Sequence, residues 1–167
     1  RMLAELTAEK ITLSAGQIDY ANPDDIHIPE NPEEYADLQA ALAAYGINRS
    51  LAPKRLPEGF AMEKLIVDCE TFVSHIVFHA SYRCGESYLM IQVDIYIEDE
   101  YRQGESFGDA YKDEGDPIPY VAGDITHLLT TNAGWPVALW ANGPAECIIS
   151  GDITMEELKQ MIDSIYE

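Results

Sequence analysis

Alternation of apolar and polar side chains over two neighbouring segments is the feature that most constrains how this chain folds. In residues 87–98, SYLMIQVDIYIE, the aliphatic side chains occupy every second position: Leu89, Ile91, Val93, Ile95 and Ile97. Residues 72–82 alternate in the same way, with one set formed by Phe72, Ile76, Phe78, Ala80 and Tyr82 and the other by Val73, His75, Val77, His79 and Ser81. Successive side chains of a strand point to opposite faces, so this period of two predicts half-buried antiparallel strands. Cys84-Gly85-Glu86 between them predicts a short hairpin connection.

Two segments near opposite ends of the chain carry the longer period of an amphipathic helix. The first is predicted to begin with Asn31 as N-cap and to end at Gly46. The second begins with Thr154 and Glu157, which have the spacing of a capping box. Their apolar residues recur every three or four positions: Tyr35, Leu38, Leu42 and Tyr45 in the first, and Met155, Leu158, Ile162 and Ile165 in the second.

Further strand-like runs lie between these helices, and together they define the fold class that we expect. The runs are PYVAGDITHLLTT, WPVALWAN and AECIISG. Strands flanked by helices predict an α+β fold: a twisted antiparallel β-sheet of about five or six strands, with an N-terminal and a C-terminal helix packed on one face. We divide the chain into an N-terminal arm and helix, residues 1–50, and an α+β domain, residues 51–167.

The charge of the chain limits its partners. Among 167 residues, 10 Lys and Arg face 30 Asp and Glu, which gives a formal net charge of −20. Such a charge repels nucleic acid and anionic membrane surfaces, so we expect neutral or cationic partners and no nucleic acid. At 47% hydrophobic residues, the chain has ample material for a core. The acidity concentrates in residues 98–116, where eight acidic side chains face two basic ones.

Metal and cofactor sites find little support in the residue patterns, and we predict no cofactor. His75 and His79 are four apart, which on a strand separates them by about 13 Å and prevents them from sharing one metal ion. The acidic segment 98–116 does not match the EF-hand spacing, and whether it binds calcium is left open. The three cysteines show no C-x-x-C spacing, so we expect structural thiols: Cys69, Cys84 and Cys147.

Hydrolytic chemistry has one formal motif. GESFG at residues 104–108 satisfies G-x-S-x-G, but it lacks the buried strand before it and the helix after it that a nucleophile elbow needs. A second hydrolase hypothesis uses acidic groups near His75 or His127 as partners of the imidazole.

Aromatic and polar side chains share the strand face opposite the aliphatic stripe. Five of them form the ligand-binding surface that we predict: His75, His79, Tyr88, Met90 and Tyr96. Exposed on an open sheet, these side chains are suited to a peptide, protein or envelope component. The alternative is that they pack beneath a covering element.

Short motifs over residues 53–167 resemble the domain of unknown function 4367. They are Leu56-Pro57-Glu58-Gly59-Phe60 before a strand, Trp140-Ala141-Asn142-Gly143, Cys147-Ile148-Ile149-Ser150-Gly151, and Ile153-Thr154-Met155-Glu156-Glu157-Leu158. Cys147 departs from the aromatic or aliphatic residue usual there. The resemblance implies a bacterial, extracytoplasmic, often membrane-anchored protein with no established catalytic residues.

These observations favour one function and leave two alternatives. The favoured one is a non-enzymatic extracytoplasmic binding or sensing domain of a larger, membrane-anchored bacterial protein. The alternatives are a structural module or spacer without its own ligand, and a hydrolase. The sequence begins with Arg1 and contains no run of 18 apolar residues, so we expect the fragment itself not to span a membrane and an anchor to precede it. The oligomeric state is left open.

Overall fold

The structure is a computed structural model that describes residues 9–13, 17–31, 34–69, 74–99 and 109–167. Within these ranges the elements follow in this order: β1 (Glu9–Thr12), the 3-10 helix η2 (Pro23–Asp25), α2 (Leu38–Ala44), β2 (Ala61–Cys69), β3 (His75–Cys84), β4 (Ser87–Tyr96), β5 (Asp109–Lys112), β6 (Ile118–Ala122), β7 (Ile125–Asn132), β8 (Trp135–Asn142), β9 (Ala145–Gly151) and α3 (Met155–Ile165).

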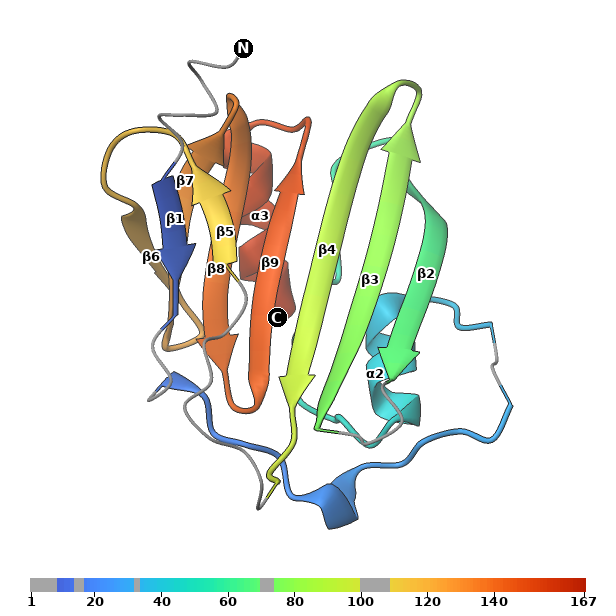
Figure 1. Cartoon of the computed structure of the whole chain (residues 1–167). Coiled ribbons are helices and arrows are strands. Elements are labelled where there is room, and N and C mark those ends of the chain that lie inside the picture. The colour runs from blue at the N-terminus through green and yellow to red at the C-terminus, as the bar shows by residue number, and fades with distance from the viewer. Residues whose placement is uncertain (1–8, 14–16, 32–33, 70–73, 100–108) are drawn as a thin grey trace.

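Seven of the described strands form one main sheet, in the order β2-β3-β4-β9-β8-β7-β6, and all neighbouring pairs are antiparallel (Figure 1). This confirms the α+β class and the antiparallel sheet, but the expected five or six strands are too few. One reason is the Gly123-Asp124 turn, where both residues adopt a left-handed φ, of 56° and 61°. Such a turn reverses the chain within two residues, so the run 119–131 contains two strands.

The strands β3 and β4 follow the alternation seen in the sequence. They pair from His75↔Tyr96 to Cys84↔Ser87, so the hairpin turn is two residues long. The aliphatic stripe is buried throughout: Ile76, Phe78, Ala80, Leu89, Ile91, Val93 and Ile95 are at most 1% exposed. Phe72 and Val73, predicted to extend this pattern, lie outside the described residues.

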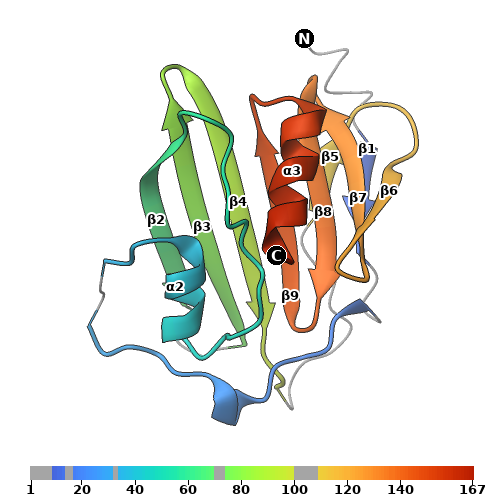
Figure 2. The same cartoon turned by 180° about the vertical axis from the view of Figure 1, so that it is seen from behind.

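Figure 2 shows α2 and α3 in front of the sheet, on the face that carries this stripe. Leu38, Leu42, Leu158 and Ile162 from the helices join the strand residues in one buried cluster with Trp140. The capping box of α3 is confirmed, since Thr154 N donates to Glu157 Oε1 and Glu157 N to Thr154 Oγ1.

The predicted start of the first helix is wrong by several residues. The N-cap of α2 is Asp37, whose Oδ1 accepts from Ala40 N at 2.8 Å, and not Asn31. An aspartate cap supplies the same acceptor as asparagine, and Asp37 directly precedes the buried Leu38. The end is close to the expectation, because Gly46, with φ of 87°, follows the C-cap Tyr45.

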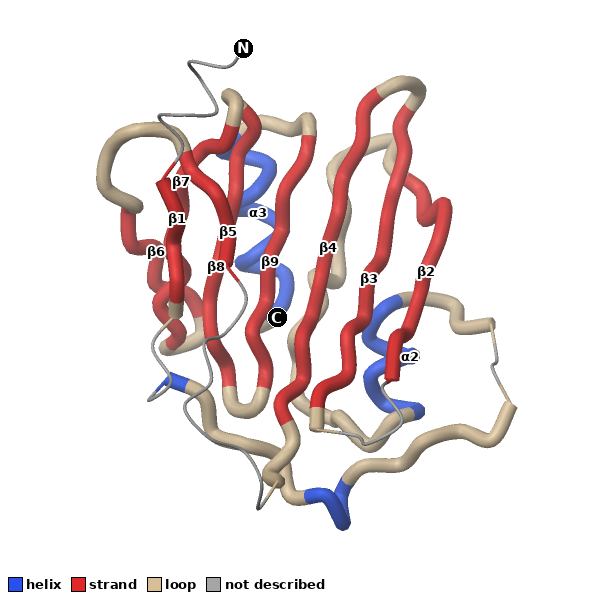
Figure 3. The backbone as a smooth tube through the Cα atoms, viewed as in Figure 1, coloured by secondary structure: helices blue, strands red, loops and turns tan. Residues whose placement is uncertain are grey.

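The opposite face of the main sheet is partly covered by a two-stranded ribbon. The strand β1 pairs with β5, so residues 9–12 meet residues 109–112, and Figure 1 shows this ribbon in front of β7 and β8. The tube in Figure 3 shows the same arrangement with the helices behind. Ile11, Leu13 and Ala110 from the ribbon segments bury Val137 and Leu139 of β8.

Candidate functional site: the open half of the sheet

Most of the face of β2, β3 and β4 that points away from the helices is left uncovered by the described residues, and the N-terminal arm covers only its end at Tyr96. We call this surface the open half of the sheet; Figure 1 looks directly onto it. Ile66 on β2 is 44% exposed, and Val77 and Met90 are half-buried. Cross-strand register places eight side chains on it: Lys64, Ile66, Asp68, Val77, His79, Ser81, Met90 and Gln92. Each row across the three strands therefore holds one apolar side chain beside two polar ones, and apolar and polar groups are interspersed on this surface.

Register places all five predicted ligand-binding residues on this face, but it spreads them along the strands. His75 is opposite Tyr96 at one end, while Met90 lies near the middle and Tyr88 at the other end. Tyr88 and Tyr96 are eight residues apart, which corresponds to about 27 Å along a strand. The Arg83 guanidinium lies over the Tyr88 ring, 5.1 Å from its centroid. The five residues therefore form a stripe and not a compact pocket.

At one end of this stripe, Tyr96 is buried and the partly exposed His75 stacks on it. Their rings stack with centroids 4.8 Å apart and an interplanar angle of 6°. Tyr96 is only 5% exposed, because Ile18 and Tyr20 of the N-terminal arm pack against it. His75 Nε2 also lies 3.6 Å from Asp94 Oδ2, within ion-pair distance. Tyr96 therefore packs beneath a covering segment, which is the alternative to an exposed binding residue.

A hydrogen-bonded chain links the middle of the surface to this end. His79 Nδ1 lies 3.1 Å from Gln92 Oε1, and Gln92 Nε2 donates to Asp94 Oδ1 at 3.1 Å. Because the amide oxygen only accepts, the proton of this bond lies on His79 Nδ1. Gln92 and Asp94 were missing from the predicted site, although the strand alternation that placed the five residues also puts both on this face.

Two buried carboxylates face each other across β4 and β9. Asp94 and Glu146 are cross-strand partners and are 7% and 4% exposed. Burial, reinforced by these two negative charges, raises the pKa of the adjacent Cys147 thiol well above its ordinary value. The thiol therefore stays protonated at neutral pH, which makes Cys147 a core residue and a poor nucleophile.

His127, the other histidine considered for catalysis, lies on the helix side of the sheet and is fully buried. Its Nδ1 is 3.0 Å from the Tyr120 carbonyl oxygen and its Nε2 is 2.7 Å from the Tyr166 hydroxyl. The carbonyl can only accept, so Nδ1 carries the proton and Nε2 accepts from Tyr166. Burial lowers the pKa of His127, and the neutral ring is thus held by two internal hydrogen bonds.

The acidic segment 98–116 is described only at its two ends. Asp113 accepts hydrogen bonds from the Thr131 hydroxyl at 2.8 Å and from Ala133 N and Gly134 N at 2.9 and 3.1 Å. These bonds lower the pKa of its carboxyl group and fasten the end of β5 to the β7–β8 turn. GESFG lies outside the described residues. Within the described ranges, no group of three or more His, Cys, Asp or Glu side chains is arranged to hold a metal ion.

The search for relatives found no match to this chain among family models, curated proteins or solved structures. Helices in the described part of the chain are also all too short or too polar to cross a membrane.

Proposed function

We propose that this chain is a non-enzymatic binding domain whose open half of the sheet contacts a peptide, protein or envelope component of neutral or positive charge. The observation that carries the proposal is the contrast within one sheet face. Ile66 of β2 is largely accessible and Val77 and Met90 are half-buried there, while Val137 and Leu139 of β8 are buried beneath the ribbon. Accessible apolar groups bordered by polar ones are typical of interaction surfaces.

Two further observations favour binding over the alternatives. A spacer has no need of an accessible apolar surface, and α2 covers the opposite face of the sheet, so it leaves the open half free. For a hydrolase, His127 lacks an available ring nitrogen, because Tyr120 and Tyr166 occupy both. His75 is stacked against a buried tyrosine, which restricts the approach of a substrate to its ring.

The location that goes with this proposal is extracytoplasmic, in a larger bacterial protein anchored to the membrane by a segment ahead of Arg1. It rests on the resemblance of residues 53–167 to the domain of unknown function 4367. The net charge of −20 fits such a role, since it favours soluble, unaggregated behaviour and disfavours adsorption to anionic lipid.

The test is a binding titration with two labelled peptides of equal length, one rich in lysine and one rich in glutamate. We expect only the cationic peptide to bind. Its affinity should fall at least several-fold when the ionic strength rises from about 0.01 M to about 0.15 M. The double variant His79→Ala with Met90→Ala should bind the cationic peptide more weakly than the wild type does. Tyr111→Ala, on the exposed side of β5, should leave this affinity unchanged. Failure of the cationic peptide to bind at any ionic strength would contradict the proposal.

A further inference from the structure

The strand β2 forms one edge of the main sheet. It pairs with β3 alone among the described strands, so every second residue of β2 directs its backbone N–H and C=O groups outward. Register is continuous from Lys64↔Ser81 to Cys69↔Ile76, and the only irregularity is the bulge at Glu63. Figures 1 and 2 both show β2 at the margin of the sheet. Residues 64–69 therefore offer a regular edge onto which a further strand can pair.

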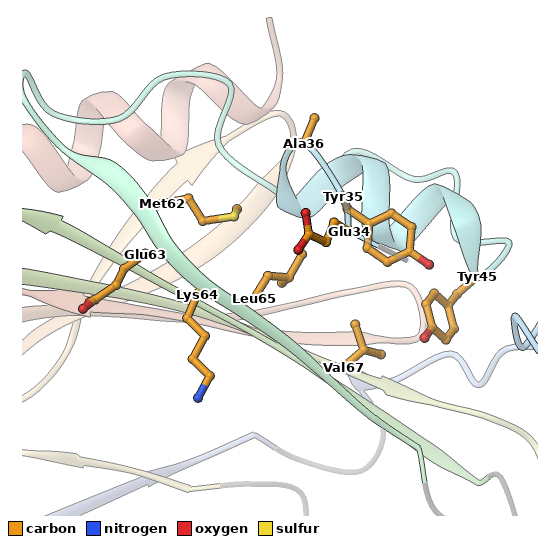
Figure 4. A pocket seen from close by; sticks show the side chains of 9 residues that line it. All are labelled: Glu34, Tyr35, Ala36, Tyr45, Met62, Glu63, Lys64, Leu65 and Val67. Atoms are coloured by element: carbon orange, nitrogen blue, oxygen red, sulfur yellow. The ribbon is translucent and has the colours of Figure 1, made fainter. Parts of the chain in front are cut away.

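A groove of about 560 Å³ runs along the helix side of this edge. Figure 4 shows Leu65 and Val67 pointing from β2 toward the segments that flank α2, with Tyr35 and Tyr45 on the opposite wall and Lys64 pointing away. The floor is thus apolar, and the opposite wall combines the two tyrosines with the carboxylate of Glu34. A groove beside an edge strand provides pockets for alternate side chains of an added strand.

The Tyr35 hydroxyl is an unusual polar group of the groove wall. It is buried in the groove wall and has no hydrogen-bond partner among the described residues. Buried polar groups are almost always paired in native proteins. Because this oxygen is shielded from solvent, a peptide group in the groove could pair with it only after the Tyr35 side chain rotates.

The charges favour a cationic occupant over a second copy of the chain. Glu34, Glu63 and Asp68 border the edge against Lys64, and Glu63 is neutralised by Arg83 at 3.1 Å. A second copy would bring another net charge of −20 to this slightly acidic edge. A basic peptide meets attraction both locally and from the whole molecule.

We infer that the outer edge of β2 binds an extended, positively charged peptide by strand addition, with alternate side chains in the groove between Tyr35 and Val67. The inference rests on the proposed binding function and specifies its site and ligand class. Side chains on one face of the added strand enter the groove, and those on the other lie beside Ile66 on the open half of the sheet.

The test uses the full chain and an acetylated, amidated peptide of alternating valine and lysine, about six residues long. Residues of a strand direct their N–H groups alternately to its two edges. N-methylation of every second residue therefore gives two peptides of equal charge. We expect one of them to lose at least about tenfold in affinity and the other to bind like the parent. Equal behaviour of the two would overturn strand addition, while leaving the proposed function intact if both still bind.

Matched charge variants locate the site. Ile66→Lys places a cation beside the added strand, and Val121→Lys makes the same charge change on β6, at the far edge, where Val121 is 67% exposed. We expect Ile66→Lys to weaken the affinity for the peptide about tenfold and Val121→Lys to weaken it less than about twofold. Circular dichroism and melting curves verify the fold of both. Equal losses would refute the location at β2. If sedimentation showed that the unliganded chain is a dimer and that Ile66→Lys dissociates it, a second copy of the chain and not a peptide would occupy the edge. If none of the peptides bound, both proposals would be overturned.

Discussion

The two halves of the main sheet differ in what covers them. In the half formed by β7, β8 and β9, α3 lies against one face and the β1–β5 ribbon packs on the other, where it buries Val137 and Leu139 of β8. Strands β2, β3 and β4 are covered by α2 on one face, and their other face is the open half of the sheet. One continuous sheet thus contains a sealed half, which resembles a sandwich, and a half that is one layer thinner.

Residue types follow this division. Beneath the ribbon the sheet presents Val137, Leu139 and Ile148, whereas the same face of β3 and β4 presents His79 and Gln92. An aliphatic side chain buried from both sides contributes to stability, and a mixed polar surface contributes to solubility and recognition. We expect the sealed half to carry more of the folding free energy, whereas the open half leaves several of its side chains accessible.

Truncation of one aliphatic side chain in each half tests this expectation with the largest effect. Leu139 is 0% exposed and packs under the ribbon, whereas Ile66 is 44% exposed. We expect Leu139→Ala to lower the free energy of unfolding by about 2–5 kcal/mol, because it leaves a cavity between two layers. Ile66→Ala should lower it by less than about 1 kcal/mol. Urea denaturation at neutral pH measures both.

Equal losses from the two variants would show that the open half is covered in solution and would remove the distinction. The m-values serve as a check, since a changed slope would indicate that the ribbon has detached from the sheet and that the two-state comparison no longer holds.

The sequence was sufficient for those parts of the fold that depend on local patterns. Strict alternation placed the faces of β3 and β4, and the Thr154–Glu157 box placed the start of α3. It was insufficient for the ribbon, which pairs residues 9–12 with residues 109–112, far apart in the sequence. Long-range pairing of two short strands leaves no local signal. The start of α2 was misplaced because Asn31 and Asp37 are equally good caps, and only packing selects between them.

The candidate site was predictable in face but not in geometry. Alternation assigned five side chains to one surface, yet it carries no information on what lies above each of them. Burial of Tyr96 depends on Ile18 and Tyr20, which precede it by more than seventy residues. The groove beside β2 was missed altogether, because it forms between a strand and the segments around a helix that are separate in the sequence.

A second test, of intermediate size, uses one hydroxyl in each half. Tyr166→Phe removes the donor to His127 Nε2, and the ring cannot respond by changing tautomer, because its other nitrogen must donate to the Tyr120 carbonyl. A buried acceptor without a partner costs about 1–3 kcal/mol. Tyr88→Phe on the open half should cost less than about 0.5 kcal/mol. If thermal and urea denaturation gave the same small loss of stability for both variants, the buried hydrogen bond between Tyr166 and His127 would contribute no more to stability than an exposed hydroxyl does.

The smallest effect concerns the bond between the ribbon and the sealed half, and it depends on pH. Both carboxylate oxygens of Asp113 accept hydrogen bonds from the β7–β8 turn, and these bonds lower its pKa below the usual 3.8. Because the folded pKa is the lower one, the stabilisation is complete above about pH 4 and is lost as the pH falls through the folded value. Asp113→Asn should therefore cost less than about 1 kcal/mol at neutral pH, since the group is near the surface, and the gap to the wild type should close below pH 3.8. Urea titrations at neutral and acidic pH measure the gap, and one that stayed constant would show that the carboxylate charge does not hold the ribbon in place.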